Sequence, residues 1–138
     1  MIWPKEFADR LTAWSALRAQ AHDMECEPAL ELINAWWHQT PWKPYYLHWD
    51  DQPRWPDPWQ LLSDDVYCPV AKGLGILYTI SMLDRADMAP TTLILTEDGS
   101  NLVQVAKEKY ILNWRAEQVL NTFTNVKIKR QYRQDQII

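Results

Sequence analysis

The chain has 138 residues, enough for one domain with a hydrophobic core and too few for two full domains. Its net charge of −4 argues against nucleic acid or an anionic membrane as the main partner. Nine tryptophans in so short a chain indicate extensive aromatic packing or an interface, because each indole buries a large area and needs a partner for its N–H.

Cysteine usage and the first residues predict the compartment. Cys26 and Cys68 are too few to define a disulfide framework. The first residues have neither the basic region nor the apolar core of a signal peptide, and no apolar run is long enough to cross a bilayer. We therefore expect a protein made in a reducing cytoplasm with no membrane partner, a description that a virion protein made inside its host also fits.

Two helices are predicted in the first third of the chain. In residues 5–21 the apolar positions recur three or four apart, at Phe7, Leu11, Trp14, Leu17 and Ala21. The charged residues of this helix, Arg10 and Arg18 among them, are expected mostly on its solvent side. A second helix is predicted to begin near Pro28, a residue suited to the first helical position, and to continue through Trp37.

Regular structure is expected to stop in residues 39–59. Five of the nine prolines lie here, which excludes a helix or a central strand, and four of the nine tryptophans make the segment too aromatic for a solvated linker. We predict an ordered loop with its rings turned inward and with a functional role. Its candidate binding residues are Trp42, Tyr45, Tyr46, Trp49 and Trp55. Exposed rings would instead suit stacking on sugars, so a carbohydrate-binding module is one alternative.

An apolar helix that begins at Cys68 is the predicted centre of the fold. A short helix over residues 58–62 leads towards it, and Pro69 suits its first position. Apolar residues then occupy nearly every side, so we predict that the helix is buried. Gly73 and Gly75 each cost about 1 kcal/mol relative to alanine inside a helix, and we expect another backbone to approach closely at that face.

Three short antiparallel strands are predicted behind the central helix. They span residues 92–96, 102–106 and 110–114, and the turns between them contain Asp98-Gly99 and the charged run at 107–109. Residues 115–123 are predicted to form a last short helix.

Residues 126–138 form a basic tail. Its positive residues are Lys127, Lys129, Arg130 and Arg133, and Val126 and Ile128 alternate in it as they would in a strand. Four positive charges on an acidic chain favour a terminal arm that packs on an acidic neighbouring subunit, and nucleic acid is not the expected partner.

The order of these elements resembles the core of the transglutaminase-like, or papain-like, fold. In that family a cysteine opens the helix, a histidine lies on the next strand and an aspartate ends the strand after it. Cys68 matches the cysteine, Ser100 or Asn101 the histidine, and Asn113 the aspartate. The resemblance covers about residues 59–114 and implies a degenerate catalytic site, because one of the three residue types is present.

No histidine follows Cys68, since His22, His38 and His48 all precede it. A cysteine nucleophile needs an adjacent base to become a thiolate and to protonate the leaving group. We therefore expect no catalytic residues. The alternative is a Cys68-dependent amidase, peptidase or transglutaminase-like enzyme, with His48 reaching the sulfur in space and Asn113 at the third position.

A second resemblance rests on the block INAWW…TPW…YYLHWDDQPRWPDPWQLLSDDVYC…AKGLGILYTI. This block is similar to small uncharacterised proteins encoded by contractile-tailed phages, especially those of cyanobacteria, over most of residues 30–114. The resemblance implies a structural role among tail and virion proteins.

No cofactor or metal ion is predicted. Oxygen ligands of the kind that calcium prefers are offered by Asp50, Asp51, Asp57, Asp64 and Asp65. They do not alternate within one loop, and helix N-caps account for Asp57 and Asp64 equally well. The three glycines form no phosphate-binding loop.

The sequence thus predicts one α+β domain over residues 1–138. It comprises a helical part (1–38), the aromatic loop (39–59), a core with a buried central helix and a small antiparallel sheet of about three strands (60–125), and the basic tail (126–138). The leading hypothesis is a non-enzymatic structural protein of a phage tail, neck or baseplate. It would bind other virion proteins or copies of itself and reside in the virion after synthesis in the host cytoplasm.

Overall fold

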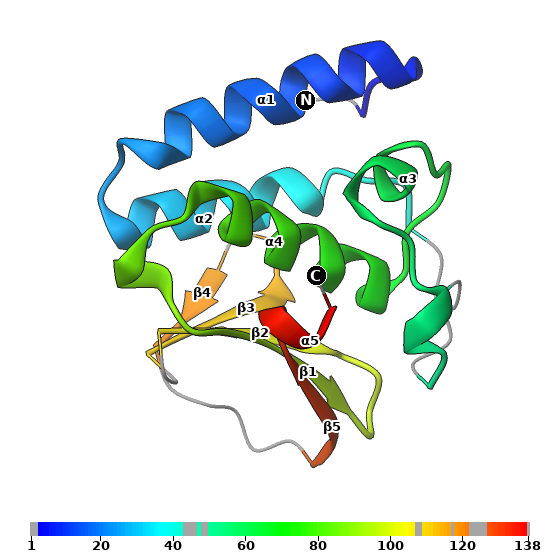
Figure 1. Cartoon of the computed structure of the whole chain (residues 1–138), viewed down its shortest axis with the longest axis vertical. Coiled ribbons are helices and arrows are strands. Elements are labelled where there is room, and N and C mark those ends of the chain that lie inside the picture. The colour runs from blue at the N-terminus through cyan, green and yellow to red at the C-terminus, as the bar shows by residue number, and fades with distance from the viewer. Residues whose placement is uncertain are drawn as a thin grey trace.

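The computed structural model describes residues 3–42, 47, 50–106, 109–116, 118–121 and 127–137. Over these residues the chain has five α-helices and a five-stranded antiparallel sheet, which confirms the predicted α+β class (Figure 1). The helices are α1 (Phe7–His22), α2 (Cys26–Trp37), α3 (Pro58–Leu62), α4 (Pro69–Leu83) and α5 (Gln134–Ile137), with 3-10 turns η1 (Gln52–Arg54) and η2 (Ala86–Met88). The strands are β1 (Thr91–Thr96), β2 (Leu102–Val105), β3 (Tyr110–Arg115), β4 (Gln118–Leu120) and β5 (Ile128–Arg133).

The elements form three layers. Helices α2 and α4 pack against each other on one face of the sheet, with α4 against β1, β2 and β3 and with α2 against β3 and β4. Helix α1 lies across the outer side of these two helices, away from the sheet (Figure 1). Apolar side chains are therefore buried both between sheet and helices and between α1 and the inner helices.

The strand order is β4-β3-β2-β1-β5, and every pairing is antiparallel. The prediction of about three strands located β1, β2 and β3 and left both edge strands out of the sheet, although the strand-like alternation in the tail indicated β5. One of these, β5, is formed by the basic tail and pairs with β1, with Tyr132 opposite Leu93. The C-terminal residues are therefore part of the sheet.

The helix predicted for residues 115–123 is wrong, because Gln118–Leu120 form strand β4. Asn34 of α2 explains the difference. Its side-chain amide donates to the backbone carbonyls of Arg115 and Gln118, at 2.5 and 3.4 Å, so these carbonyls are engaged by α2. The chain then pairs back onto β3, with Arg115 opposite Gln118.

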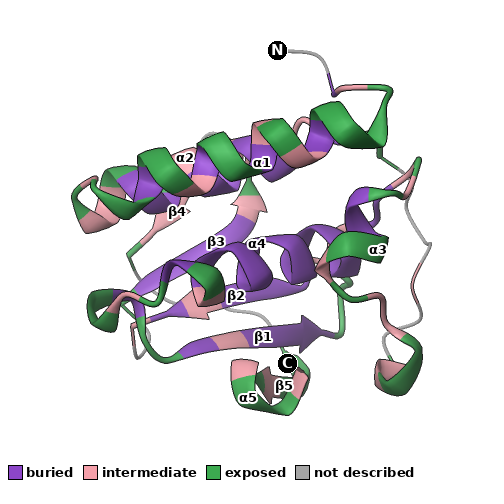
Figure 2. Cartoon of the chain, turned by 45° about the horizontal axis from the view of Figure 1, so that its top comes forward, coloured by how far each residue is buried: buried purple, intermediate pink, exposed green. Residues whose placement is uncertain are grey.

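Helix α4 is buried as predicted, with 12 of its 15 residues shielded from solvent (Figure 2). We expected another backbone to approach Gly73 and Gly75, but side chains lie against both glycines instead. A Cβ on Gly75 would lie 2.5 Å from the ring of Trp37, and a Cβ on Gly73 would lie 2.8 Å from Cδ1 of Leu93. The two glycines therefore let α2 and the sheet pack closely against α4.

The length of α4 also bears on membranes. Its 15 residues rise about 22 Å, which is less than the roughly 30 Å of a bilayer's hydrocarbon core. None of the helices in the described ranges combines the length and the apolar character needed to cross a membrane.

Tryptophans join the three main helices through one hydroxyl. Trp14 of α1 and Trp37 of α2 both donate their indole N–H to Oγ1 of Thr79 on α4, each at 2.9 Å. The same hydroxyl donates to the carbonyl of Gly75 at 2.7 Å. All of these groups are buried, so a single threonine satisfies the polar atoms of two core tryptophans.

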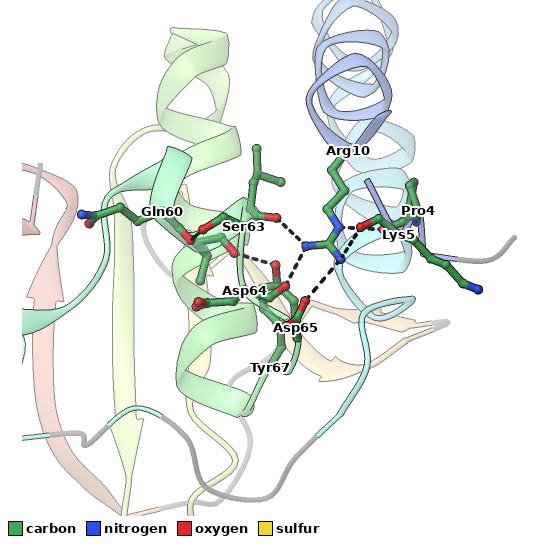
Figure 3. Close-up of polar contacts among 10 residues, drawn as sticks. Pro4, Lys5, Arg10, Gln60, Ser63, Asp64, Asp65 and Tyr67 are labelled. Atoms are coloured by element: carbon green, nitrogen blue, oxygen red, sulfur yellow. Dashed lines mark hydrogen bonds and ion pairs between the residues drawn. The ribbon is translucent and has the colours of Figure 1, made fainter. Parts of the chain in front are cut away.

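Arg10 of α1 faces inward, which corrects its expected place on the solvent side. It is 5% exposed, and its guanidinium donates to the carbonyls of Pro4, Leu62 and Asp64 at 2.6, 3.0 and 2.8 Å (Figure 3). The carboxylate of Asp65 lies 3.8 Å away. Carbonyls that follow a helix need donors, and a long arginine side chain reaches several of them at once. Helix α1 therefore fixes the segment that leads from α3 into α4.

Candidate functional site

The start of α4 is held by two residues of the aromatic loop, Pro41 and Trp42. The carbonyl of Pro41 accepts the N–H of Tyr67 at 2.8 Å, and Trp42 forms an isolated parallel bridge with Tyr67. Cys68 then takes the N-cap position and Pro69 the first helical position, as the sequence predicts. The backbone at the cysteine is therefore fixed by the loop as well as by the helix.

The thiol of Cys68 is shielded from solvent. The residue is 1% exposed, and its Sγ accepts the backbone N–H of Leu47 at 3.4 Å. His48, the base in the alternative hypothesis, lies outside the described residues. The second cysteine, Cys26, is partly exposed, and burial together with the nearby Asp87 carboxylate raises the pKa of its thiol.

Asn113 lies beside the first turn of α4. Its side-chain amide donates to the carbonyls of Pro69 and Asn101, at 2.9 and 2.7 Å. Its backbone N–H donates to Oδ1 of Asn34 at 2.9 Å. The residue that matches the family's aspartate is thus close to the cysteine end of the helix, and its amide joins β3 to α4 and to the β1–β2 turn.

Ser100 and Asn101, which match the family's histidine, belong to the turn between β1 and β2. The side-chain carbonyl of Asn101 accepts the N–H of Thr96 at 3.1 Å. The N–H and hydroxyl of Ser100 donate to the Asp98 carboxylate at 3.0 and 2.7 Å. Hydrogen bonds from Thr96 and then from Ser100 lower the pKa of Asp98. Both positions therefore stabilise the turn.

A pocket of about 250 Å³, which we call the α4 pocket, opens where these elements meet. Its described lining consists of His38, Trp42, Pro69, Lys72, Ser100, Asn113, Trp114 and Arg115. This described lining contains no acidic residue and two cationic ones, Lys72 and Arg115. Lys72 is 7% exposed, and burial lowers the pKa of its ammonium group. The pocket is therefore basic, with two indole rings in its wall.

Sequence reasoning did not select four of these lining residues as candidates, namely His38, Lys72, Trp114 and Arg115. His38 follows α2, and its Nδ1 lies 2.7 Å from the carbonyl of Asn34. Lys72 carried a usable signal, because it is the one charged residue in a helix predicted to be buried on all sides. Arg115 carried none, since the strand it ends was expected to give way to a helix there.

The structure describes two of the five aromatic residues predicted to bind. Trp42 is 60% exposed, so the expectation of inward-facing rings is wrong for this residue, which lines the α4 pocket. Trp55 is partly buried and packs edge-on against Tyr132 of β5, with ring centroids 5.3 Å apart. The described residues do not include Tyr45, Tyr46 and Trp49.

The four basic residues of the tail lie on β5 or directly before it. Lys127 precedes the strand, which contains Lys129, Arg130 and Arg133. Arg130 forms an ion pair with Asp50 at 3.0 Å, and Arg133 pairs with Asp135 within the tail at 3.3 Å. The strand is exposed along nearly its whole length, so it presents a basic surface at one edge of the sheet.

Acidic residues in the described ranges do not gather into a metal site. No group of three or more histidine, cysteine or acidic side chains there is placed to hold an ion. Asp57 caps α3, since its carboxylate accepts the N–H of Gln60 at 2.8 Å and the Gln60 side chain accepts the N–H of Asp57 at 3.1 Å. A helix cap thus accounts for this aspartate.

Comparison with family models, curated proteins and solved structures finds no match to this chain. What the protein does must therefore be inferred from the start of α4, from the pocket beside it and from β5.

Proposed function

We propose that this protein is a non-enzymatic structural component of a phage virion, in the tail, neck or baseplate, that binds other virion proteins or copies of itself. The environment of the Cys68 thiol carries the non-enzymatic part of this proposal. A cysteine nucleophile must be reachable by substrate and must face a base that takes up its proton. The sulfur of Cys68 is instead buried and accepts the N–H of Leu47, so it acts as an internal acceptor between the aromatic loop and α4.

The exposed strand β5 supports the binding part. It is the last strand in the order β4-β3-β2-β1-β5, so one of its sides has no strand neighbour among the described residues. Ile128 at its start is 42% exposed, and basic side chains follow on a chain of net charge −4. An acidic segment of a neighbouring subunit that adds to this edge as a strand fits both features.

Two further features support a place in a virion. The block within residues 30–114 that resembles proteins of contractile-tailed phages includes the aromatic loop and α4. Trp42, in the same block, exposes a large apolar ring of the kind that is enriched at protein interfaces.

A Cys68-dependent amidase, peptidase or transglutaminase-like enzyme is the alternative, because Cys68 heads α4 and Asn113 lies beside its first turn. Alkylation by iodoacetamide separates the two. In the native protein we expect Cys26 to be modified and Cys68 to react only after unfolding, as peptide mass spectrometry over a time course would measure. Cys26→Ser gives the rate of Cys68 alone. Rapid native alkylation of Cys68 would favour the enzyme and contradict our proposal.

Particle composition tests the virion assignment directly. In purified particles of the phage that encodes this chain, quantitative mass spectrometry should find the protein in a constant ratio to the tail proteins. Its absence from complete particles would overturn the assignment. Binding to a glycan array that is lost in Trp42→Ala would favour a carbohydrate-binding module instead.

A further inference from the structure

Lys72 places a charged group in the buried helix α4, and no described residue supplies a counterion. It is 7% exposed and lines the α4 pocket. Among the described residues its ammonium forms no hydrogen bond or ion pair, and only the Cys68 sulfur acts on its charge. Burial of an ammonium group without a partner is unfavourable, which is why the pKa of Lys72 is lowered. An anion bound in the pocket would relieve this penalty.

The other polar groups of the pocket also favour a negatively charged ligand. Arg115 adds a second cation, and the described lining contains no carboxylate that would compete for it. The pocket also lies at the N-terminal end of α4, where the helix dipole is positive.

The apolar part of the wall limits the rest of the ligand. Trp42 and Trp114 contribute indole rings and Pro69 a saturated ring, surfaces that pack well against a flat apolar group. The volume of about 250 Å³ is below the range of pockets that hold drug-sized molecules, so it suits one ring with a short acidic arm.

We propose that the α4 pocket binds a carboxylate carried on an aromatic or bulky apolar group, with the carboxylate at Lys72 and Arg115 and the apolar group between Trp42 and Trp114. The chemistry has two sources, a free aromatic acid and the C-terminal residue of a polypeptide. This inference does not depend on the virion assignment, because it concerns a pocket that the β5 interface does not use.

Calorimetric titration of the full chain at neutral pH and low salt tests the proposal. The probes are 3-phenylpropanoate, its neutral amide, and N-acetyl-Ala-Phe with either a free or an amidated C-terminus. We expect the two carboxylates to bind and the two amides to bind at least about tenfold more weakly. Tighter binding of the peptide acid than of phenylpropanoate identifies a polypeptide terminus as the source, and the reverse order identifies a free acid.

Variants locate the binding. Lys72→Met replaces a desolvated charge with an apolar chain of similar length, so it should keep or raise the midpoint of thermal unfolding while weakening carboxylate binding at least about tenfold. Arg115→Gln, at an exposed position, should weaken binding without a change in stability. Lys5→Met removes the same charge from an exposed site and should leave binding unchanged.

Three results would overturn the proposal. The first is no carboxylate binding up to about 10 mM. The second is equal binding of acids and amides. The third is unchanged binding in both Lys72→Met and Arg115→Gln.

Discussion

The indole ring of Trp37 lies directly against the backbone of Gly75. Three of its ring carbons would be 2.5, 2.5 and 2.6 Å from a Cβ at that position. Non-bonded carbon atoms favour separations of about 3.5–4.0 Å, so α2 packs on α4 at this point because residue 75 has no side chain. The same ring donates its N–H to Thr79, which fixes where it can lie.

Gly75→Ala should lower the free energy of unfolding by about 1–3 kcal/mol despite the higher helix propensity of alanine, because the ring of Trp37 cannot move without losing its hydrogen bond. Gly73→Ala is the matched control. The same change in the same helix there meets Cδ1 of Leu93, the end of a flexible side chain, and should lower stability less. Urea unfolding of both variants measures the difference. A Gly75→Ala protein as stable as Gly73→Ala would contradict this packing.

Thr79→Val removes the acceptor that Trp14 and Trp37 share while it keeps the side-chain shape. Two buried N–H groups then lose their acceptor, which costs about 1–3 kcal/mol for each group. We therefore expect the free energy of unfolding to fall by about 2–5 kcal/mol. Thr79→Ser retains the hydroxyl and should show a smaller loss, which reflects one missing methyl group. Denaturant titration compares them, and equal losses in the two variants would mean that the hydroxyl is not what joins the helices.

Arg10→Met should lower the free energy of unfolding by about 2–4 kcal/mol, because the carbonyls of Leu62 and Asp64 lose a charged donor in a buried place. Arg54→Met serves as the control. The side chain of Arg54 is 85% exposed and lies 3.8 Å from Asp51, a surface pair whose loss should change stability by less than about 1 kcal/mol. Thermal and urea unfolding measure both variants, and similar losses would show that Arg10 does not hold the segment before α4.

Tyr78 should make stability depend on pH in the alkaline range. Its hydroxyl donates to the carbonyl of Pro56 at 2.6 Å, and burial, with a smaller effect of Asp57, raises its pKa to about 12. The native state therefore holds the phenol proton more tightly than the unfolded chain, in which tyrosine ionises near pH 10. The resulting contribution to the free energy of unfolding is fully present below about pH 10. It is lost as the pH rises to about 12, and the loss amounts to at most about 2–3 kcal/mol.

The comparison with Tyr78→Phe isolates that contribution. Urea unfolding should show that the stability of the native protein relative to the variant is constant below about pH 10 and falls between about pH 10 and 12. Parallel pH profiles for the two proteins across this window would contradict the raised pKa of Tyr78.

Local signals were sufficient to predict the centre of the fold. Pro69 and the apolar run after it indicate a buried helix, and Asp98-Gly99 marks the β1–β2 hairpin. The edge strands depend on distant partners. Strand β4 forms where Asn34 of α2 engages its carbonyls, and β5 forms because β1 offers it an open edge. Neither partner can be identified from the pattern of the segment itself.

The candidate site divides in the same way. The place of Cys68 at the start of a helix follows from its own neighbours in the sequence. Its burial does not, because the Leu47 amide that meets its sulfur lies in a loop without a periodic pattern. The inward turn of Arg10 was missed for a related reason, since helical periodicity does not show which carbonyls a long side chain will reach. Lys72 was detectable in principle as a lone charge in an apolar helix.

Because β5 pairs with β1 but is the last strand in the chain, the order of synthesis affects when the sheet can be completed. As the chain leaves the ribosome, one edge of β1 has unpaired backbone groups until residues 128–133 have been synthesised and can pair with it. A stop codon or a proteolytic cut between β4 and β5 would leave this edge of β1 unpaired in the shortened chain. Other chains could then pair with the exposed edge and aggregate.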